Sequence, residues 1–167
     1  MNSVGRIFIS YRRDDASGTA GRLYDRLATR LGTDRVFMDV EAISPGYDFA
    51  QTIEYAVARC DVVLALIGNE WSTAVDRWGR RRLDDPNYFV GLEINAGLAR
   101  NIPVIPVLVD GAMQIQAVDL PRHISALARR QSVRIHHESF SVDIDNLLSV
   151  LQRLVPTLQT DEVPHVK

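Results

Sequence analysis

The sequence predicts an α/β domain in which one parallel sheet is covered by helices on both faces. Two almost wholly aliphatic runs, residues 61–68 and 102–109, are typical of strands that are buried on both sides. Helical patterns alternate with these and the other strand-like runs, and such alternation implies right-handed crossovers and parallel pairing. We therefore expect a flavodoxin-like three-layer fold with five strands in the order 2-1-3-4-5.

Each expected element has its own local signal. The strands are expected at residues 6–10, 35–40, 61–68 and 102–109, with a weaker fifth strand at 133–137, and the helices at residues 19–31, 49–59, 84–100 and 145–154. Asp48 and Gln51 resemble a capping box that opens the second helix. Pro86 in the first turn and Arg100 in the last turn indicate the third helix. Two prolines interrupt the fourth strand, which favours a position near the edge of the sheet.

The composition fits one globular domain. The chain has 167 residues, of which 46% are apolar and 24% charged, and its formal net charge is −2. This balance argues against a domain that binds nucleic acid by neutralising phosphates, and neither a signal peptide nor a membrane span is expected. The single cysteine, Cys60, excludes an intrachain disulfide and is expected to be a core residue in a reducing cytoplasm. The domain is expected over residues 1–156, followed by a polar linker, residues 157–167, that leads to a further domain.

Glu93 stands on the apolar face of the third expected helix. At about 100° per residue, its neighbours on that face include Phe89, Ala96 and Gly97, none of which is polar. An unpaired buried charge is costly, so this pattern indicates either a cleft or a partner. The helix by itself favours a structural role, such as an ion pair with Arg100, over a catalytic one.

The loops that follow the strands are the expected binding segments, because ligands of such sheets bind beyond the carboxyl ends of the strands. The first of these loops begins at Ser10 and continues as Tyr11, Arg12 and Arg13. Guanidinium groups bind phosphate oxygens in bidentate geometry, although the two aspartates that follow leave open a solvated, neutralised pair. The crossover geometry brings the start of the Glu93 helix to the same edge. We therefore expect one carboxylate, two arginines and several aromatic residues around one cleft.

Several other signals carry no site. Four arginines within residues 77–82 adjoin three aspartates, which indicates a solvated loop rather than a nucleic-acid patch. The glycine spacing fits neither a dinucleotide fingerprint nor a phosphate loop, and the histidines are too scattered to form a metal site. We thus expect no metal and no resident cofactor.

Five motifs, in order, resemble the TIR (Toll/interleukin-1 receptor) domain family in its bacterial form. They are residues 8–15 (FISYRRDD), 36–40 with 43–46 (VFMDV and ISPG), 61–67 (DVVLALI), the Glu93 helix, and 102–107 (IPVIPV). Each motif alone is weak, but five in register are specific. The resemblance extends from about residue 6 to about residue 154.

This resemblance implies two different functions. Many TIR domains cleave NAD⁺ at the nicotinamide glycosidic bond, giving ADP-ribose or a cyclic isomer, whereas others only scaffold signalling. In the catalytic members a helix glutamate follows an aromatic residue, usually tryptophan, by four positions, and Glu93 with Phe89 matches this spacing. NAD⁺ would then be a substrate and not a cofactor.

The resemblance also assigns expected roles to other residues. Substrate contacts are expected from residues in or near the strand-end loops and the Glu93 helix, namely Ser10, Tyr11, Arg12, Arg13, Phe37, Asp39, Trp71 and Phe89. Core packing is the alternative for the aromatic residues, and a turn cap is the alternative for Asp39. Indole and phenyl rings both stack, but phenylalanine at position 89 lacks the indole donor.

An assembly loop is expected at residues 41–49. Ile43, Pro45, Gly46 and Tyr47 would form its contact surface. By the resemblance, contact between neighbouring chains completes the active site. The expected partners are therefore NAD⁺ and other TIR domains, in cytoplasmic defence signalling of bacteria, with no nucleic-acid or membrane partner.

Two other flavodoxin-like classes compete with this interpretation. A response-regulator receiver needs a phosphoacceptor aspartate at the end of the third strand, where this sequence has Leu66, Ile67 and Gly68. A nucleoside deoxyribosyltransferase also uses a catalytic glutamate. The second-strand motif and the Pro-Gly loop favour a TIR domain over the transferase.

Overall fold

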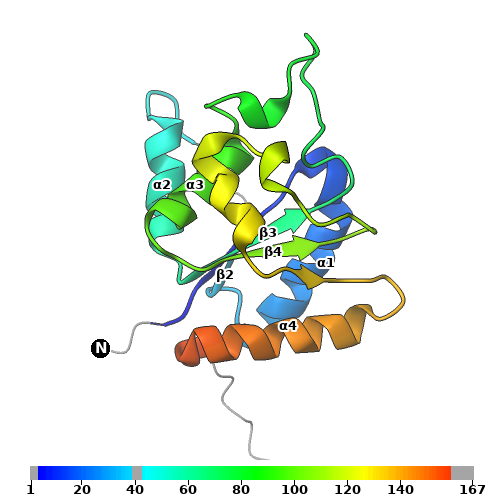
Figure 1. The fold of residues 1–167 in the computed structure, drawn as a ribbon. Helices are drawn as coiled ribbons and strands as arrows, with labels where there is room; N and C mark the ends of the chain where they lie inside the picture. The colour runs from blue at the N-terminus through cyan, green and yellow to red at the C-terminus, as the bar shows by residue number, and fades with distance from the viewer. Residues whose placement is uncertain (1–3, 39–42, 159–167) are drawn as a thin grey trace, which may run out of the picture.

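The structure, a computed structural model, describes residues 4–38 and 43–158. Its five strands are parallel and lie in the order β2-β1-β3-β4-β5, which confirms the predicted flavodoxin-like sheet (Figure 1). The strands are β1 (Ile7–Ser10), β2 (Val36–Met38), β3 (Val62–Ile67), β4 (Val104–Leu108) and β5 (Val133–Arg134).

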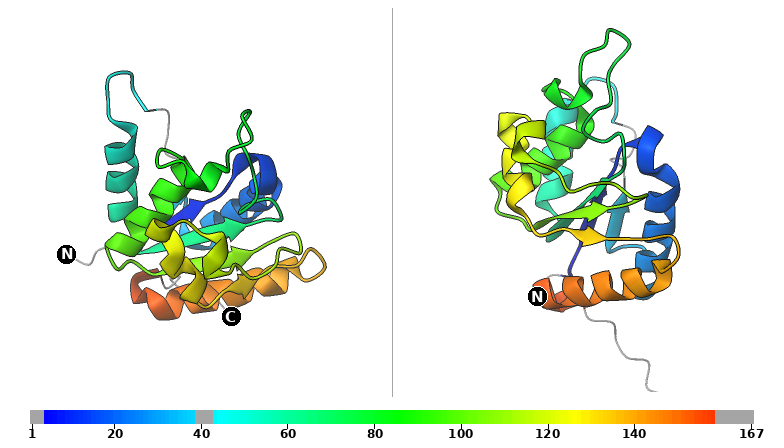
Figure 2. Two further views of the ribbon diagram at one scale, coloured as in Figure 1. Left: turned by 45° about the horizontal axis from the view of Figure 1, so that its top comes forward. Right: turned by 45° about the vertical axis from the view of Figure 1, so that its right-hand side comes forward.

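Helices cover both faces of this sheet (Figure 2). α1 (Arg13–Leu31) and α4 (Phe140–Leu154) pack on one face, and α2 (Phe49–Ala58), α3 (Phe89–Ala99) and the 3₁₀ helix η3 (Arg122–Arg129) pack on the other. Each face of the sheet forms a separate hydrophobic core with its helices. In β1, Ile7 and Ile9 belong to the core under α1 and α4, and Phe8 belongs to the core under α2 and α3. Because successive residues of a strand face opposite sides, one continuous apolar run serves two separate cores.

α3 begins later than predicted, at Phe89 rather than at residue 84. Residues Arg82–Asp84 form the 3₁₀ helix η1 instead, and Asp85 is extended, with φ −76° and ψ 117°. The cause is Pro86, whose ring disfavours the helical conformation of the residue before it. The predicted structural partner of Glu93 is also wrong, because Arg100 pairs with Glu54 of α2 at 3.1 Å.

Two other helices begin earlier than predicted. α1 starts at Arg13 rather than at residue 19, and its Ala16 leaves the helical conformation at φ −131°. Asp14 and Asp15 stand in its first turn, where acidic side chains interact favourably with the helix dipole. α4 starts at Phe140 rather than at residue 145, with Asp143 in its first turn. The predicted cap of α2 is present, since the Asp48 carboxylate accepts hydrogen bonds from two backbone N–H groups.

β4 is the second strand from one edge of the sheet. Pro106 pairs with Ala65 of β3, while β5 joins β4 only at Val107 and Leu108. The proline therefore lies where no outer strand requires a donor, which explains how it fits inside an otherwise buried strand.

The described chain ends in the 3₁₀ helix η4 (Pro156–Leu158), and the buried Leu158 packs into the core with α1 and α4. The packed part of the chain thus reaches two residues into the expected linker, whose remaining residues lie outside the described ranges. No helix within residues 4–38 and 43–158 is both long and apolar enough to cross a membrane.

Gly97 brings α3 close to the sheet. A Cβ at this position would lie 2.9 Å from Val104 Cγ2 and 3.2 Å from Val63 Cγ2, whereas a Cβ at Gly21 in α1 would meet nothing within 4 Å. We expect Gly97→Ala to lower the free energy of unfolding by about 1 kcal/mol, because overpacking outweighs the gain in helix propensity. Gly21→Ala should raise it by about 0.5–1 kcal/mol. Urea unfolding measures the free energy of unfolding of both variants. Equal changes in the two variants would contradict the close approach of α3 to the sheet.

Cys60 is buried, and its burial together with the nearby Asp61 carboxylate raises the pKa of the thiol from 9.0 to about 12. Only the thiolate is nucleophilic, so the difference of about three units lowers the reactive fraction at pH 8 by roughly 1,000-fold. We expect iodoacetamide to alkylate the folded protein at pH 8 more slowly than the urea-unfolded protein by at least that factor. Mass spectrometry of timed samples measures the two rates, and similar rates would contradict the burial.

Candidate functional site

A cavity of about 380 Å³ lies at the carboxyl end of β1, between the starts of α1 and α3. This is the edge at which parallel sheets of this type bind ligands. We call it the Glu93 cavity, and it is lined by Tyr11, Arg12, Arg13, Asp14, Arg82, Asp85, Asn87, Tyr88, Phe89, Val90 and Glu93.

Glu93 is held by the last residue of β1. Its side chain is only 7% exposed, and the buried Ser10 Oγ donates a hydrogen bond of 3.0 Å to Glu93 Oε1. The apolar neighbours Val90, Ala96 and Gly97 are buried around it, as the helical pattern predicts. A hydroxyl 83 residues away in sequence thus provides a partner for a carboxylate that would be costly to bury alone.

Arg12 is a buried arginine in the wall of the cavity. It is 9% exposed, and its ion pairs with Asp14 and Glu70 are long, at 3.6 and 3.8 Å. Both carboxylates are mostly exposed and thus screened by water. The buried Nε and Nη1 atoms of Arg12 have no hydrogen-bond partner among the described residues. Arg12 therefore retains the capacity to bind an anion.

Arg82 is a wall residue that the sequence analysis missed. It opens η1, it lines the cavity, and its buried Nε has no hydrogen-bond partner among the described residues. Burial raises the pKa of the neighbouring Tyr88 hydroxyl, while the positive charges of Arg12 and Arg82 act in the opposite direction. The one available signal was Leu83, an apolar residue in a polar run, which is buried and anchors η1 against the core.

The first turn of α1 is fixed against the end of β3. The Asp15 carboxylate accepts a hydrogen bond of 3.4 Å from the backbone N–H of Glu70, and a Cβ on Gly68 would lie 2.6 Å from its Oδ2. Burial raises the pKa of Asp15, and the hydrogen bond from Glu70 and the charge of Arg12 oppose this effect. The close packing fixes the start of α1, and with it the arginine segment, relative to the sheet.

Phe89, Tyr11 and Arg13 also line the cavity. The Phe89 ring is half exposed, and its centroid lies 5.6 Å from that of Phe49 in α2, with a tilt of 35°. Phe49 is the last residue of the expected assembly loop and the first residue of α2, so the ring contact connects the mouth of the cavity to that loop.

Three expected substrate contacts, Ser10, Phe37 and Trp71, are not among the lining residues of the cavity. Trp71 is buried in the core between the sheet and the α2–α3 layer, which agrees with the packing alternative. Phe37 lines a different cavity beside β2. Asp39 lies outside the described residues.

In the expected assembly loop, Ile43 is half buried, while Pro45, Gly46 and Tyr47 are exposed, the tyrosine to 72%. Gly46 has φ +90°, a conformation that favours glycine and turns the loop. The role of this surface in assembly stays a prediction. Within the described ranges, no group of three or more His, Cys, Asp or Glu residues is arranged to hold a metal ion.

Comparison with known proteins gives one family match. A sequence model of the TIR domain matches residues 7–148. A search of curated proteins finds no match.

Among solved structures, the chain is similar to the TIR domains of an activated Roq1 resistosome that recognises the pathogen effector XopQ, with 17% identity, 92% of this chain and 83% of that chain covered, and a TM-score of 0.48. It is also similar to a metazoan TIR-STING receptor from C. gigas, with 18% identity, coverage of 83% and 38%, and a TM-score of 0.47. It is similar as well to the CMP N-glycosidase BcmB of Clostridium botulinum, with 15% identity, 85% of this chain and 96% of that chain covered, and a TM-score of 0.47.

Proposed function

Because the chain belongs to the TIR domain family, we propose that its Glu93 cavity cleaves NAD⁺ between nicotinamide and ribose. The observation that carries this proposal is the buried hydrogen bond between Ser10 Oγ and Glu93 Oε1 in the wall of a cavity that also contains arginines. The cavity therefore combines an oriented carboxylate with cationic groups at the edge of the sheet where ligands bind.

The chemistry of NAD⁺ suits a single carboxylate. Glycosidases generally use two carboxyl groups, because the departing oxygen must be protonated. The nicotinamide of NAD⁺ is already cationic and leaves as a neutral molecule. Glu93 would therefore act by binding ribose hydroxyls and by stabilising the positive charge that develops on the sugar, and the low exposure of its carboxylate strengthens that interaction.

Ser10 would act as a positioning residue. Its hydroxyl belongs to a buried strand and holds one carboxylate oxygen at 3.0 Å, so the carboxylate has a defined orientation before substrate arrives. Arg12 and Arg82 would bind the negatively charged phosphates of the substrate through their buried N–H groups. Phe89 offers a half-exposed ring for stacking against a base or nicotinamide.

We expect Glu93→Gln to lower the rate of nicotinamide release from NAD⁺ by about 100-fold or more, because the amide cannot oppose the charge that develops on the sugar. The assay follows nicotinamide by chromatography, with concentrated or assembled protein. Glu138→Gln, on an exposed glutamate outside the cavity, is the matched control and should leave the rate unchanged. Equal rates for wild type and Glu93→Gln would refute the catalytic role.

Arg82 gives a second test of the same site. We expect Arg82→Gln to raise KM for NAD⁺ by about tenfold and to change kcat little, because one charge-assisted hydrogen bond to phosphate is worth roughly 1.5–3 kcal/mol. The matched control is Arg80→Gln, which removes an arginine two positions away that pairs with Asp76 and does not line the cavity. An unchanged KM in Arg82→Gln would exclude Arg82 from substrate binding.

The second candidate function is a non-enzymatic interaction domain, and the exposed loop favours it. Tyr47 is an apolar surface residue beside an exposed Pro-Gly turn, as a contact loop requires. Under this alternative the wild type releases no nicotinamide even when light scattering verifies that it is assembled. Under both functions, Tyr47→Ala should weaken self-association.

A further inference from the structure

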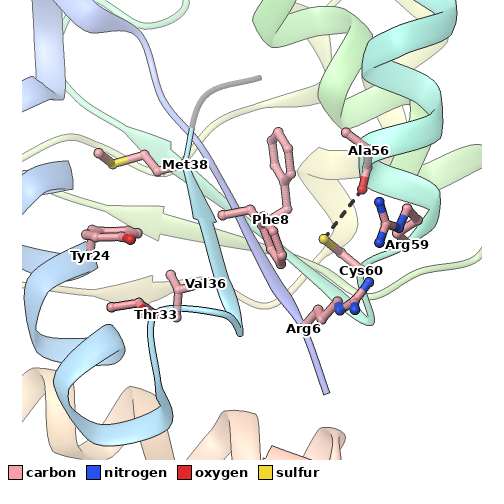
Figure 3. A pocket seen from close by; sticks show the side chains of 10 residues that line it. Arg6, Phe8, Tyr24, Thr33, Val36, Met38, Ala56, Arg59 and Cys60 are labelled. Atoms are coloured by element: carbon pink, nitrogen blue, oxygen red, sulfur yellow. Dashed lines mark hydrogen bonds between the residues drawn. The ribbon is translucent and has the colours of Figure 1, made fainter. Parts of the chain in front are cut away.

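A second cavity, of about 510 Å³, lies along β2, and none of its lining residues lines the Glu93 cavity. Figure 3 shows Tyr24 and Met38 on one side of β2, and Arg6, Arg59 and Cys60 on the other. We call this cavity the β2 trough, and its lining comprises Arg6, Phe8, Tyr24, Thr33, Val36, Phe37, Met38, Ala56, Arg59 and Cys60.

The trough follows an open sheet edge. β2 is the terminal strand, and within the described sheet it pairs only with β1. Proteins usually protect such edges with lysine, proline or a covering element, because unpaired N–H and C=O groups accept a further strand. β2 is short, which itself limits pairing, but its residues Val36, Phe37 and Met38 include neither lysine nor proline, and Phe37 is 38% exposed.

One wall of the trough carries two positive charges, and the nearby Asp61 carboxylate accepts a hydrogen bond of 2.8 Å from the Arg6 backbone N–H. Arg6 and Arg59 line the trough, and its lining residues within 4–38 and 43–158 include no carboxylate. The Arg6 guanidinium lies 5.9 Å from the Phe37 ring centroid and that of Arg59 lies 5.6 Å from the Tyr55 ring centroid. Neither arginine forms an ion pair with any residue in the described ranges. An occupant with acidic groups on this side would therefore gain charge complementarity.

The same charges decide between possible occupants. If two copies of the chain paired their β2 edges about a twofold axis, each copy would present the same described lining, which contains no carboxylate, so Arg6 and Arg59 would gain no charged partner. A small anion would neutralise the arginines but leave the strand edge unpaired. An extended acidic segment satisfies both requirements.

We propose that the β2 trough binds an extended segment of another protein, which adds a strand to β2 and alternates acidic with apolar residues. Side chains of a strand alternate between its two faces. The acidic positions face Arg6 and Arg59, and the apolar positions face Tyr24 and Met38 on the α1 side. Main-chain hydrogen bonds to β2 supply affinity, and the two walls supply specificity.

The test uses a fluorescein-labelled peptide, Thr-Glu-Val-Glu-Val-Glu-Val-Thr, and fluorescence anisotropy. It should bind at least tenfold more tightly than the peptide in which lysine replaces glutamate. The formal net charge of the protein is −2, so non-specific attraction would favour the lysine peptide. Arg59→Glu should weaken binding of the glutamate peptide by at least tenfold. Arg77→Glu changes the net charge equally at an exposed residue outside the trough and should change binding less than twofold.

A peptide methylated on alternate backbone nitrogens separates strand addition from simple charge attraction. With the nitrogens that would face β2 methylated, the peptide can no longer donate main-chain hydrogen bonds to that strand. Its affinity should therefore fall at least tenfold. Equal affinity for the methylated peptide, equal affinity for the lysine peptide, or unaltered binding by Arg59→Glu would each overturn the proposal. Self-association that depends on Arg59 would overturn it in favour of a second copy, and circular dichroism checks that each variant is folded.

Discussion

The hydrogen bond from Ser10 to Glu93 joins the end of β1 to α3, which begins at the same edge of the sheet. A carboxylate among Val90, Ala96 and Gly97 is stable only if its polar atoms have partners, because burial removes it from water. Ser10 provides such a partner because parallel pairing of β1 with β3 ends both strands at one edge, where α3 begins. The location of the site is therefore a consequence of the sheet order.

The negative and positive side chains around this hydrogen bond occupy different parts of the cavity. Glu93 is oriented toward Ser10 at the base of α3, while Arg12 and Arg82 contribute buried N–H groups to the walls of the same cavity. Under the proposed function, this separation would match the charges of NAD⁺, which is positive at its reacting end and negative at its phosphates. The β2 trough differs, since its described lining residues include two arginines and no carboxylate, and it follows a strand that has a neighbour on one side only within the described sheet. The two cavities thus lie at different places on the sheet, one at the end of β1 and the other along β2.

The local sequence predicted some features and misplaced others for physical reasons. The pleat of β1 and the apolar runs of β3 and β4 are set by residue type, so their strands and order were predictable. The start of α3 was misplaced because Pro86 was treated as a first-turn residue, while its effect on Asp85 prevented the helix from beginning there. Arg82 was assigned to a solvated run because nothing in its neighbours' charges shows that η1 turns it toward the cavity.

Residue periodicity and the direction of parallel strands were enough to predict the layers, the strand order and two polar segments, the Ser10–Arg13 loop and Glu93. The partners of those residues depend on tertiary packing. Ser10 rather than Arg100 meets Glu93, Trp71 packs in the core, and Arg82 joins Arg12 at the cavity. Such pairings depend on how elements far apart in the chain pack together, and a local sequence pattern does not specify contacts between distant elements.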